Sequence, residues 1–241
     1  MRTFGIIAAC LLAFCAAWST RFPDGRWRYR LTLEVDTPEG VKTGASVVEV
    51  HSWSEEFLPV PGSPTAIRVK GEAAAVDLGA RGVLFAVLRS ETNVDNAYWI
   101  VWNSFPVPGT KPGTTQRGSD GIRYYHSLQG KAEVPALAMP MLVRFRDIND
   151  PTSVERVEPD DLAKSFGPGV SLRHMTIEMV SAGWWPFNWF GITGEPVTTG
   201  IEKRLAWLSV YPEPGLARAT NPLNPQFSAT VHHGDFRRGL Q

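Results

Sequence analysis

Residues 27–36, WRYRLTLEVD, alternate between apolar and polar side chains without a break. Successive side chains of a β-strand point to opposite faces, so this pattern predicts a strand that is buried on one face and exposed on the other. Residues 37–40, TPEG, follow as a typical tight turn, and residues 41–51 form the expected return strand. An antiparallel hairpin is therefore the element from which we expect the rest of the fold to be built.

The return strand contains one change of phase. Its apolar side chains occupy odd positions up to Val47 and even positions from Val48 onward. An extra residue in one strand of a pair shifts the two faces in this way, so we expect a β-bulge near Val47.

Further strand patterns follow along the chain. A second antiparallel pair is expected from residues 66–78 and 83–89, and the unbroken apolar run at 83–88 predicts a strand buried on both faces. Residues 98–102, YWIVW, favour another strand or a buried bridge. The other segments with strand composition are residues 141–147, 170–180 and 227–231.

Helical signals are short. Weak helical spacing occurs at residues 120–130, and residues 162–166 predict a clearer helix, with Pro159 at its first position and Gly167 as the cap at its far end. Residues 199–202, TGIE, have capping-box spacing and predict another short helix. The apolar side chains on one face of that helix are Ile201, Leu205 and Leu208.

These patterns predict a mainly β fold of the β-rich α+β class. We expect antiparallel sheets in a sandwich-like or strongly curved arrangement, with a few short helices. Residues 21–241 are expected to form one domain, and residues 106–121, rich in glycine, proline, serine and threonine, are the place for an internal boundary.

The chain begins with the pattern of an export segment. Arg2 precedes an apolar run at residues 4–18, and polar residues follow at 19–21. This run is typical of a secretory signal and is short for a membrane span, which needs about 20 residues. Signal cleavage, retention as a membrane anchor, and a buried core helix are therefore all open for residues 1–20. The first two place residues 21–241 outside the cytoplasm unless an anchor inserts in the inverted orientation, which the arginines soon after the apolar run leave open.

Cysteine usage and charge restrict the remaining chain. Both cysteines, Cys10 and Cys15, fall within the apolar run, so a processed domain would contain none and would depend on an apolar core for its stability. The chain has 24 lysines and arginines and 24 acidic residues. A balance of zero gives no overall attraction for nucleic acid, so no nucleic-acid partner is expected.

No familiar catalytic or cofactor motif occurs in the sequence, and no cofactor is predicted. Asp147, Asp150 and His126 are weak candidates for a catalytic site assembled from dispersed residues. The spacing of Asp147, Asn149 and Asp150 also suits calcium, but the full binding loop is absent, so an Asx-type turn is the simpler interpretation.

One short segment has metal-ligating residue types. His232, His233 and Asp235 are weak metal candidates because imidazole and carboxylate groups are common ligands. Adjacent histidines in a strand would point to opposite faces, which favours a solvated turn or edge strand.

Residues 184–190, WWPFNWF, form the most unusual patch of the sequence. Proline and the flanking Gly183 and Gly191 predict a loop. Its aromatic side chains are Trp184, Trp185, Phe187, Trp189 and Phe190. Such side chains anchor protein partners or membrane interfaces. A loop folded back over the sheet to close the core is nevertheless the favoured interpretation, and contact with a protein, a membrane or a sugar is the alternative.

Three blocks of sequence carry a resemblance to a known family. They are WRYRLTLEVDTPEGVKTGASVVEV at 27–50, MLVRFRDINDPTSVERVEPDDLAKSFGPGV at 141–170 and EPVTTGIEKRL at 195–205. Together they resemble an uncharacterised family of bacterial, mainly proteobacterial, exported or signal-anchored proteins. The resemblance implies a place in the bacterial envelope and no activity, cofactor or catalytic residue. The aromatic segment looks like an insertion between the second and third blocks.

We therefore predict a non-enzymatic binding or interaction module of the bacterial envelope. It is expected in the periplasm, either associated with the inner membrane through residues 4–18 or released by signal cleavage. A protein partner at the aromatic loop is part of this hypothesis. The alternative is a hydrolase whose site is assembled from dispersed aspartate and histidine residues.

Overall fold

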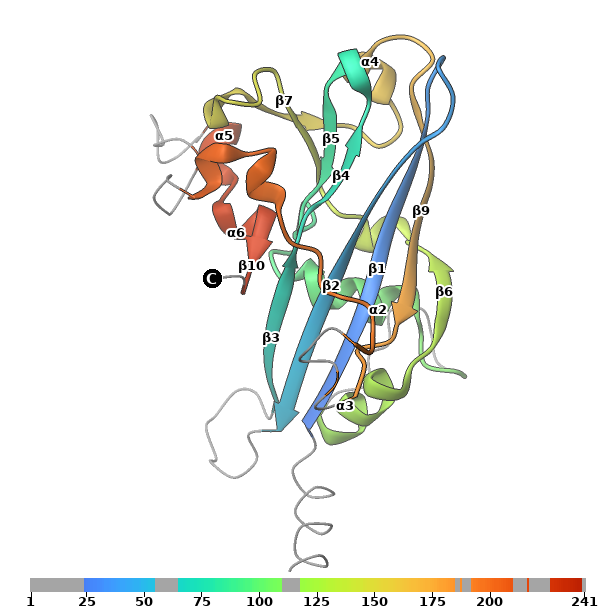
Figure 1. Cartoon of the computed structure of the whole chain (residues 1–241). Coiled ribbons are helices and arrows are strands. Elements are labelled where there is room, and N and C mark those ends of the chain that lie inside the picture. Colours follow the sequence, from blue (N-terminus) through green and yellow to red (C-terminus); the bar gives the residue numbers. More distant parts are fainter. Residues whose placement is uncertain are drawn as a thin grey trace, which may run out of the picture.

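The computed structural model describes residues 24–54, 65–109, 118–184, 187, 192–209, 216 and 226–239. They form two antiparallel sheets with short helices around them (Figure 1). The larger sheet, in spatial order, contains β10 (Arg237–Arg238), β3 (Thr65–Glu72), β2 (Lys42–Ser54), β1 (Asp24–Asp36), β9 (Ser171–Val180) and β6 (Gly130–Glu133). The smaller sheet contains β4 (Ala74–Asp77), β5 (Val83–Ala86), β7 (Leu142–Phe145) and β8 (Val154–Val157). The predicted β-rich α+β fold with antiparallel sheets is confirmed.

Strand β1 lies inside the larger sheet, between β2 and β9. Its odd-numbered apolar side chains are all buried: Trp27, Tyr29, Leu31, Leu33 and Val35. The turn at residues 37–40 closes the hairpin, and β2 pairs with β1 along its length, from Asp24 opposite Trp53 to Val35 opposite Lys42. The hairpin predicted from residues 27–51 is therefore confirmed. We call the buried side of this sheet the inner face and the opposite side the outer face.

The bulge predicted near Val47 is wrong. The pairing of β1 with β2 runs through Val47 without a shift, and the irregularity occurs instead between β1 and β9, at Glu34 and Val35. Val48 is buried on the inner face, whereas Val47 is buried on the outer face. A later segment covers Val47, because Thr198 N donates to Val47 O at 3.0 Å and Val47 N donates to Thr198 Oγ1 at 2.8 Å.

The predicted strand at residues 66–78 is divided. It breaks at Ala73 into β3, in the larger sheet, and β4, which pairs with β5 in the smaller one. The smaller sheet thereby packs on the inner face, and the backbones approach so closely that a Cβ at Gly44 would lie 2.1 Å from Ala75 O. Strand β5 is buried on both faces as expected, since Leu84 and Phe85 belong to different apolar clusters.

Two helices cover the part of the inner face that the smaller sheet leaves open (Figure 1). They are α2 (Asn96–Ser104) and α3 (Gly118–Ser127). Tyr29 Oη donates to Ala97 O at 2.6 Å, and the rings of Trp27 and Tyr125 lie 5.8 Å apart. The weak helical pattern at 120–130 is thus confirmed as α3.

The strand or bridge predicted at residues 98–102 is wrong, because these residues lie within α2. The buried positions Ala97, Ile100, Val101 and Ser104 have helical spacing. Apolar residues also occupy the other sides of this short helix, so its sequence reads as a continuous apolar run. Such a run does not distinguish a buried strand from a buried helix.

The strands expected at 141–147 and 170–180 are confirmed as β7 and β9, and the helix at 162–166 as α4 (Leu162–Phe166). Its predicted start was wrong, because Asp161 rather than Pro159 precedes the first turn and accepts a hydrogen bond from Lys164 N at 3.2 Å. The capping box predicted at 199–202 is also absent. That segment enters η4 (Ile201–Lys203), a 3-10 helix, and Gly200 N and Ile201 N donate to the buried carboxylate of Glu72.

The last predicted strand, at residues 227–231, is wrong. Residues Phe227–Thr230 form the helix α5, and α6 (His233–Phe236) follows. The remaining short elements are the 3-10 helices η1 (Gly79–Arg81), η2 (Ala136–Ala138), η3 (Pro151–Ser153) and η5 (Ala206–Ser209). A second apolar cluster joins this region to the smaller sheet through contacts between aromatic rings, among them Phe85, Phe145, Trp207 and Phe236.

Some predictions fall outside the described residues. They include the export segment at residues 4–18 with Cys10 and Cys15, and residues 110–117 of the expected boundary at 106–121. Within the described ranges, no helix is long and apolar enough to cross a membrane.

The close approach of the two sheets gives a direct test. We expect Gly44→Ala to lower the free energy of unfolding by about 2–4 kcal/mol, because its Cβ would overlap the backbone of β4. Chemical denaturation measures this loss. Gly234→Ala is the matched control, because a Cβ there meets no atom within 4 Å. Equal stability of the two variants would contradict the packing of the sheets at Gly44.

Candidate functional site

The outer face of the larger sheet carries a group of charged side chains at the end where β1 begins. The pairing of the strands places Arg26 opposite His51, and His51 opposite Arg68. It likewise places Arg28 opposite Glu49, and Glu49 opposite Lys70. We call this set the basic face: Arg26, Arg28, Glu49, His51, Arg68 and Lys70.

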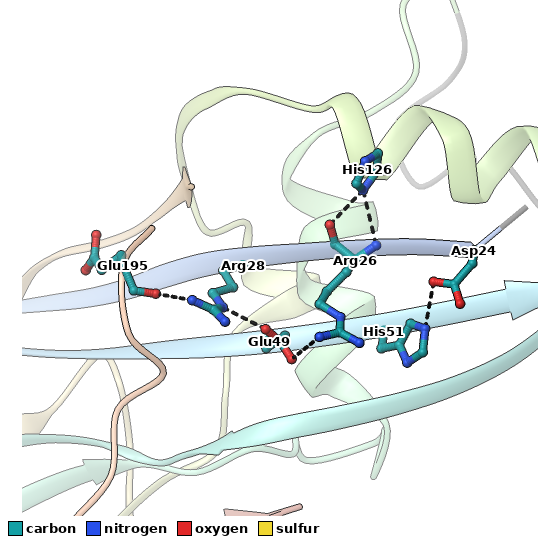
Figure 2. Close-up of polar contacts among 7 residues, drawn as sticks. All are labelled: Asp24, Arg26, Arg28, Glu49, His51, His126 and Glu195. Atoms are coloured by element: carbon teal, nitrogen blue, oxygen red, sulfur yellow. Dashed lines mark hydrogen bonds and ion pairs between the residues drawn. The ribbon is translucent and has the colours of Figure 1, made fainter. Parts of the chain in front are cut away.

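Glu49 is the charge partner at the centre of the basic face (Figure 2). Its carboxylate accepts a hydrogen bond from Arg28 Nε at 2.7 Å and lies 3.9 Å from Arg26. The side chains of Arg28 and Glu49 are only 12% and 11% exposed, so they form the covered part of the face. A second donor of Arg28 reaches the backbone oxygen of Glu195 at 2.5 Å.

The segment that carries Glu195 crosses the outer face, as Figure 2 shows. We call residues 193–200 the strap. The Glu195 carboxylate accepts hydrogen bonds from Arg30, and a third contact links Arg30 to Glu178 at 2.7 Å. The hydrogen bond with Glu195 raises the pKa of Arg30. Carboxylates therefore compensate both arginines that lie next to the strap.

The positive charges on the β3 side of the basic face have fewer acidic partners. Arg68 and Lys70 are exposed and form no ion pair within the described residues. Arg68 instead lies over the ring of Trp53, with 5.7 Å between its guanidinium carbon and the ring centre. The neighbouring His51 contacts the same ring and also pairs with Asp24 at 2.8 Å. The Arg68 guanidinium over this ring and the exposed Lys70 thus remain available to an anion from solution.

A surface depression of about 510 Å³ opens beside Arg26. It forms where β1 extends beyond the end of β9, because the pairing of these strands begins only at Arg28 and Val180. Its polar lining comes from Arg26, His126, Ser127 and Gln129. Its apolar lining includes Trp27, Leu128 and Met179. A lining that combines a cation, several hydrogen-bonding groups and apolar side chains suits a small polar or anionic ligand.

His126 lines this depression from α3 and is held by the backbone of β1. Its Nδ1 lies 3.1 Å from Arg26 N and 2.8 Å from Arg26 O (Figure 2). A neutral ring can accept from the first atom, and a protonated Nδ1 can donate to the second. The hydroxyl of Ser127 donates back to the oxygens of Arg123 and Tyr124. The structure therefore does not pair Ser127 with His126 as a nucleophile and base.

The neck of the aromatic loop lies next to the same depression. Ser181 O accepts from Glu195 N at 2.8 Å, and a Cβ at Gly194 would lie 2.4 Å from Gly183 N. The two ends of the loop therefore touch. Trp184, Phe187 and Ile192 are 61%, 39% and 69% exposed, so these side chains do not close the core. The other aromatic candidates, Trp185, Trp189 and Phe190, lie outside the described residues.

The weak catalytic candidates do not meet. Asp147 and Asp150 lie in the turn between β7 and β8, whereas His126 lies on α3 at the opposite end of the described fold (Figure 1). Asp147 accepts from Asn149 N, and Asp150 accepts from Thr152 N, each at 2.9 Å. The hydrogen bonds from Thr152 lower the pKa of Asp150. These contacts are those of the predicted Asx-type turn, which is confirmed.

The solvated turn or edge strand expected at the weak metal candidates is wrong, because His233 and Asp235 lie in the helix α6 and Asp235 is buried. Asp235 is buried and accepts from His232 N at 2.8 Å, with Arg89 at 3.9 Å. The ring of His233 packs near Trp207 instead. Within the described residues, no group of three or more histidines, cysteines or acidic residues is arranged to hold a metal ion.

Sequence reasoning missed the basic face as a unit. The alternation at residues 26–30 does place three arginines on one side of β1, and that signal was available. Arg68 and Lys70 join them only through the register of β2 with β3. That register is set by long-range pairing and leaves no local motif.

Comparisons with known proteins add no functional assignment. Protein-family models, curated proteins and solved structures all give no match to this chain.

The pairing at the centre of the basic face can be tested by stability. We expect Glu49→Gln to cost about 2–3 kcal/mol of unfolding free energy, because Arg28 would stay covered without its carboxylate. Urea denaturation measures the loss. Glu178→Gln is the control, since that carboxylate is 43% exposed and its loss should cost less than about 1 kcal/mol. A larger loss at Glu178 than at Glu49 would contradict this assignment.

Burial raises the pKa of Asp235, which predicts a pH dependence. A carboxyl whose pKa is higher in the folded state contributes stability below its unfolded pKa and loses that contribution as pH rises through the folded pKa. Wild type should therefore gain stability relative to Asp235→Asn when the pH falls from 7 towards 4. Denaturation midpoints of both proteins across this range measure the change.

Asp150→Asn provides the control of opposite sign. The pKa of Asp150 is lowered, so wild type should keep its stability relative to that variant down to about pH 4 and lose it only on further acidification. A pH-independent difference between wild type and Asp235→Asn would refute the prediction for Asp235.

Proposed function

We propose that this chain is a non-enzymatic binding module that works outside the cytoplasm in the bacterial envelope, held at the inner membrane by residues 4–18. One observation carries the binding role. The basic face, the depression beside Arg26 and the exposed aromatic side chains lie together at the end of the fold where β1 begins. This concentration of exposed recognition groups supports a binding surface.

The arrangement of the acidic residues favours binding over hydrolysis. A hydrolase needs an acid and a base within hydrogen-bond reach of one substrate position. Asp147 and Asp150 accept hydrogen bonds within the turn between β7 and β8, and His126 lies at the other end of the described fold. The hydrolase alternative therefore receives no support from the geometry.

The position of β1 agrees with a tether at this end. Five residues, 19–23, lie between Trp18, the last residue of the apolar run, and Asp24, the first residue of β1, so the chain takes six residue steps from one to the other. An extended chain spans at most about 3.3–3.6 Å per residue, so Asp24 could lie no more than roughly 20 Å from a membrane-embedded segment. The tether would keep the basic face close to the membrane surface.

The test of anchoring is the intact mass of the native protein together with membrane fractionation. We expect a full-length mass in the membrane fraction, released by detergent but not by high salt. Protease added to spheroplasts should digest the domain while a cytoplasmic marker protein survives. A mass shortened by about nineteen residues in the soluble fraction would contradict the anchor, and protection from protease would contradict the location.

A further inference from the structure

We infer that the basic face and the aromatic loop together dock on the surface of an anionic phospholipid bilayer, the membrane to which the chain is tethered. The inference deepens the proposed function and rests on it. It assigns the partner of the binding surface to lipid headgroups. The residues assigned to the contact are Arg26, Arg68, Lys70, Trp53, Trp184, Phe187 and Ile192.

Charge is the first reason. The strap and Glu49 compensate the covered cation Arg28, but Arg68 and Lys70 extend into solvent without an acidic partner in the described part of the chain. The Arg26 side chain is 46% exposed, and its guanidinium lies 3.9 Å from the Glu49 carboxylate, which is too far for a hydrogen bond. An anionic headgroup layer attracts cations of this kind, about fivefold in population for each lysine or arginine near the surface.

The composition of the neighbouring loop is the second reason. The rings of Trp184 and Phe187 are in tilted contact with 4.4 Å between their centres, and the N–H of Ile192 donates to Phe187 O at 3.0 Å. Among the described residues of this segment, the exposed large apolar side chains are therefore two aromatic rings and one aliphatic chain. Aromatic side chains concentrate at membrane interfaces, where an indole can be half buried and keep its N–H in water.

The strap begins at the neck of the loop and lies on the outer face, the face that carries the exposed cations of β3. It leaves the neck of the loop at Glu195 and crosses the outer face at Arg28, between the loop and the exposed cations of β3. One flat surface could therefore contact both groups together. A protein partner would need acidic and apolar patches at the same spacing, whereas a bilayer offers both along its whole surface.

The experiment uses the full chain with one fluorescent label. Cys10→Ser and Cys15→Ser remove the native thiols, and Ile192→Cys provides the only labelling site for an environment-sensitive NBD group. The labelled chain is reconstituted through its N-terminal segment into vesicles of phosphatidylcholine, with or without about 30% phosphatidylglycerol. The readouts are NBD fluorescence and its quenching by iodide.

We expect brighter and less quenchable NBD on the anionic vesicles. Arg68→Gln combined with Lys70→Gln should lower the ratio of docked to undocked chains roughly 25- to 30-fold and return the signal to its value on neutral vesicles. Lys42→Gln combined with Lys164→Gln removes the same charge from the far end of β2 and from α4, and should leave the signal unchanged. In the unsubstituted labelled chain, about 0.5 M salt should abolish the difference between the two lipids.

Flotation of the vesicles separates this inference from the proposed function. A chain that floats with both vesicle types but gives the same NBD signal on them overturns the docking and leaves the anchored binding module intact. An equal loss of signal in both double variants also overturns it, because net charge rather than the basic face would then be responsible. A chain that fails to float overturns the anchoring and, with it, the docking that depends on it.

Discussion

Burial of one side of β1 is the constraint on which the rest of this structure depends. Five apolar side chains, evenly spaced along thirteen residues, need cover over a length that no single short element provides. The smaller sheet covers one part and the helices α2 and α3 cover the other. The break at Ala73 follows from this division, because one continuous strand must leave the first sheet and enter the second.

The same alternation decides the chemistry of the opposite side. Every second residue of β1 faces outward, and three of these are arginines near its beginning. Where the strap covers the outer face, Glu49, Glu178 and Glu195 compensate the positive charge, since a desolvated cation without a partner is strongly destabilising. Where the face remains open, water solvates the cations and the fold requires no acidic partner.

Local patterns predicted those parts of the fold that depend on local rules. The hairpin at β1 and β2, the strand β9 and the helix α4 follow from alternation, turn residues and capping. The errors at Val47 and at α2 have a different origin. Val47 breaks the alternation because the strap, which is distant in the sequence, buries it on the outer face. Helix α2 has apolar residues on most of its sides, so its sequence shows no helical periodicity. For the candidate site, the sequence marked Trp184 as unusual, whereas the basic face depended on the register of β2 with β3 and was missed.

The contrast between the two halves of the outer face separates structural charge from functional charge. Arg28 and Arg30 hold the strap in place, and their contacts are complete. Arg68 and Lys70 form no ion pair with an acidic residue in the described part of the chain. Lys70 lies opposite Glu49 in the sheet, but the Glu49 carboxylate is hydrogen-bonded to Arg28. Their removal would not leave a buried charge unpaired, so stability alone does not explain their presence. The part of the face that the fold does not need for itself lies on β3, at the end of the sheet where β1 begins and where a tethered domain would meet its membrane.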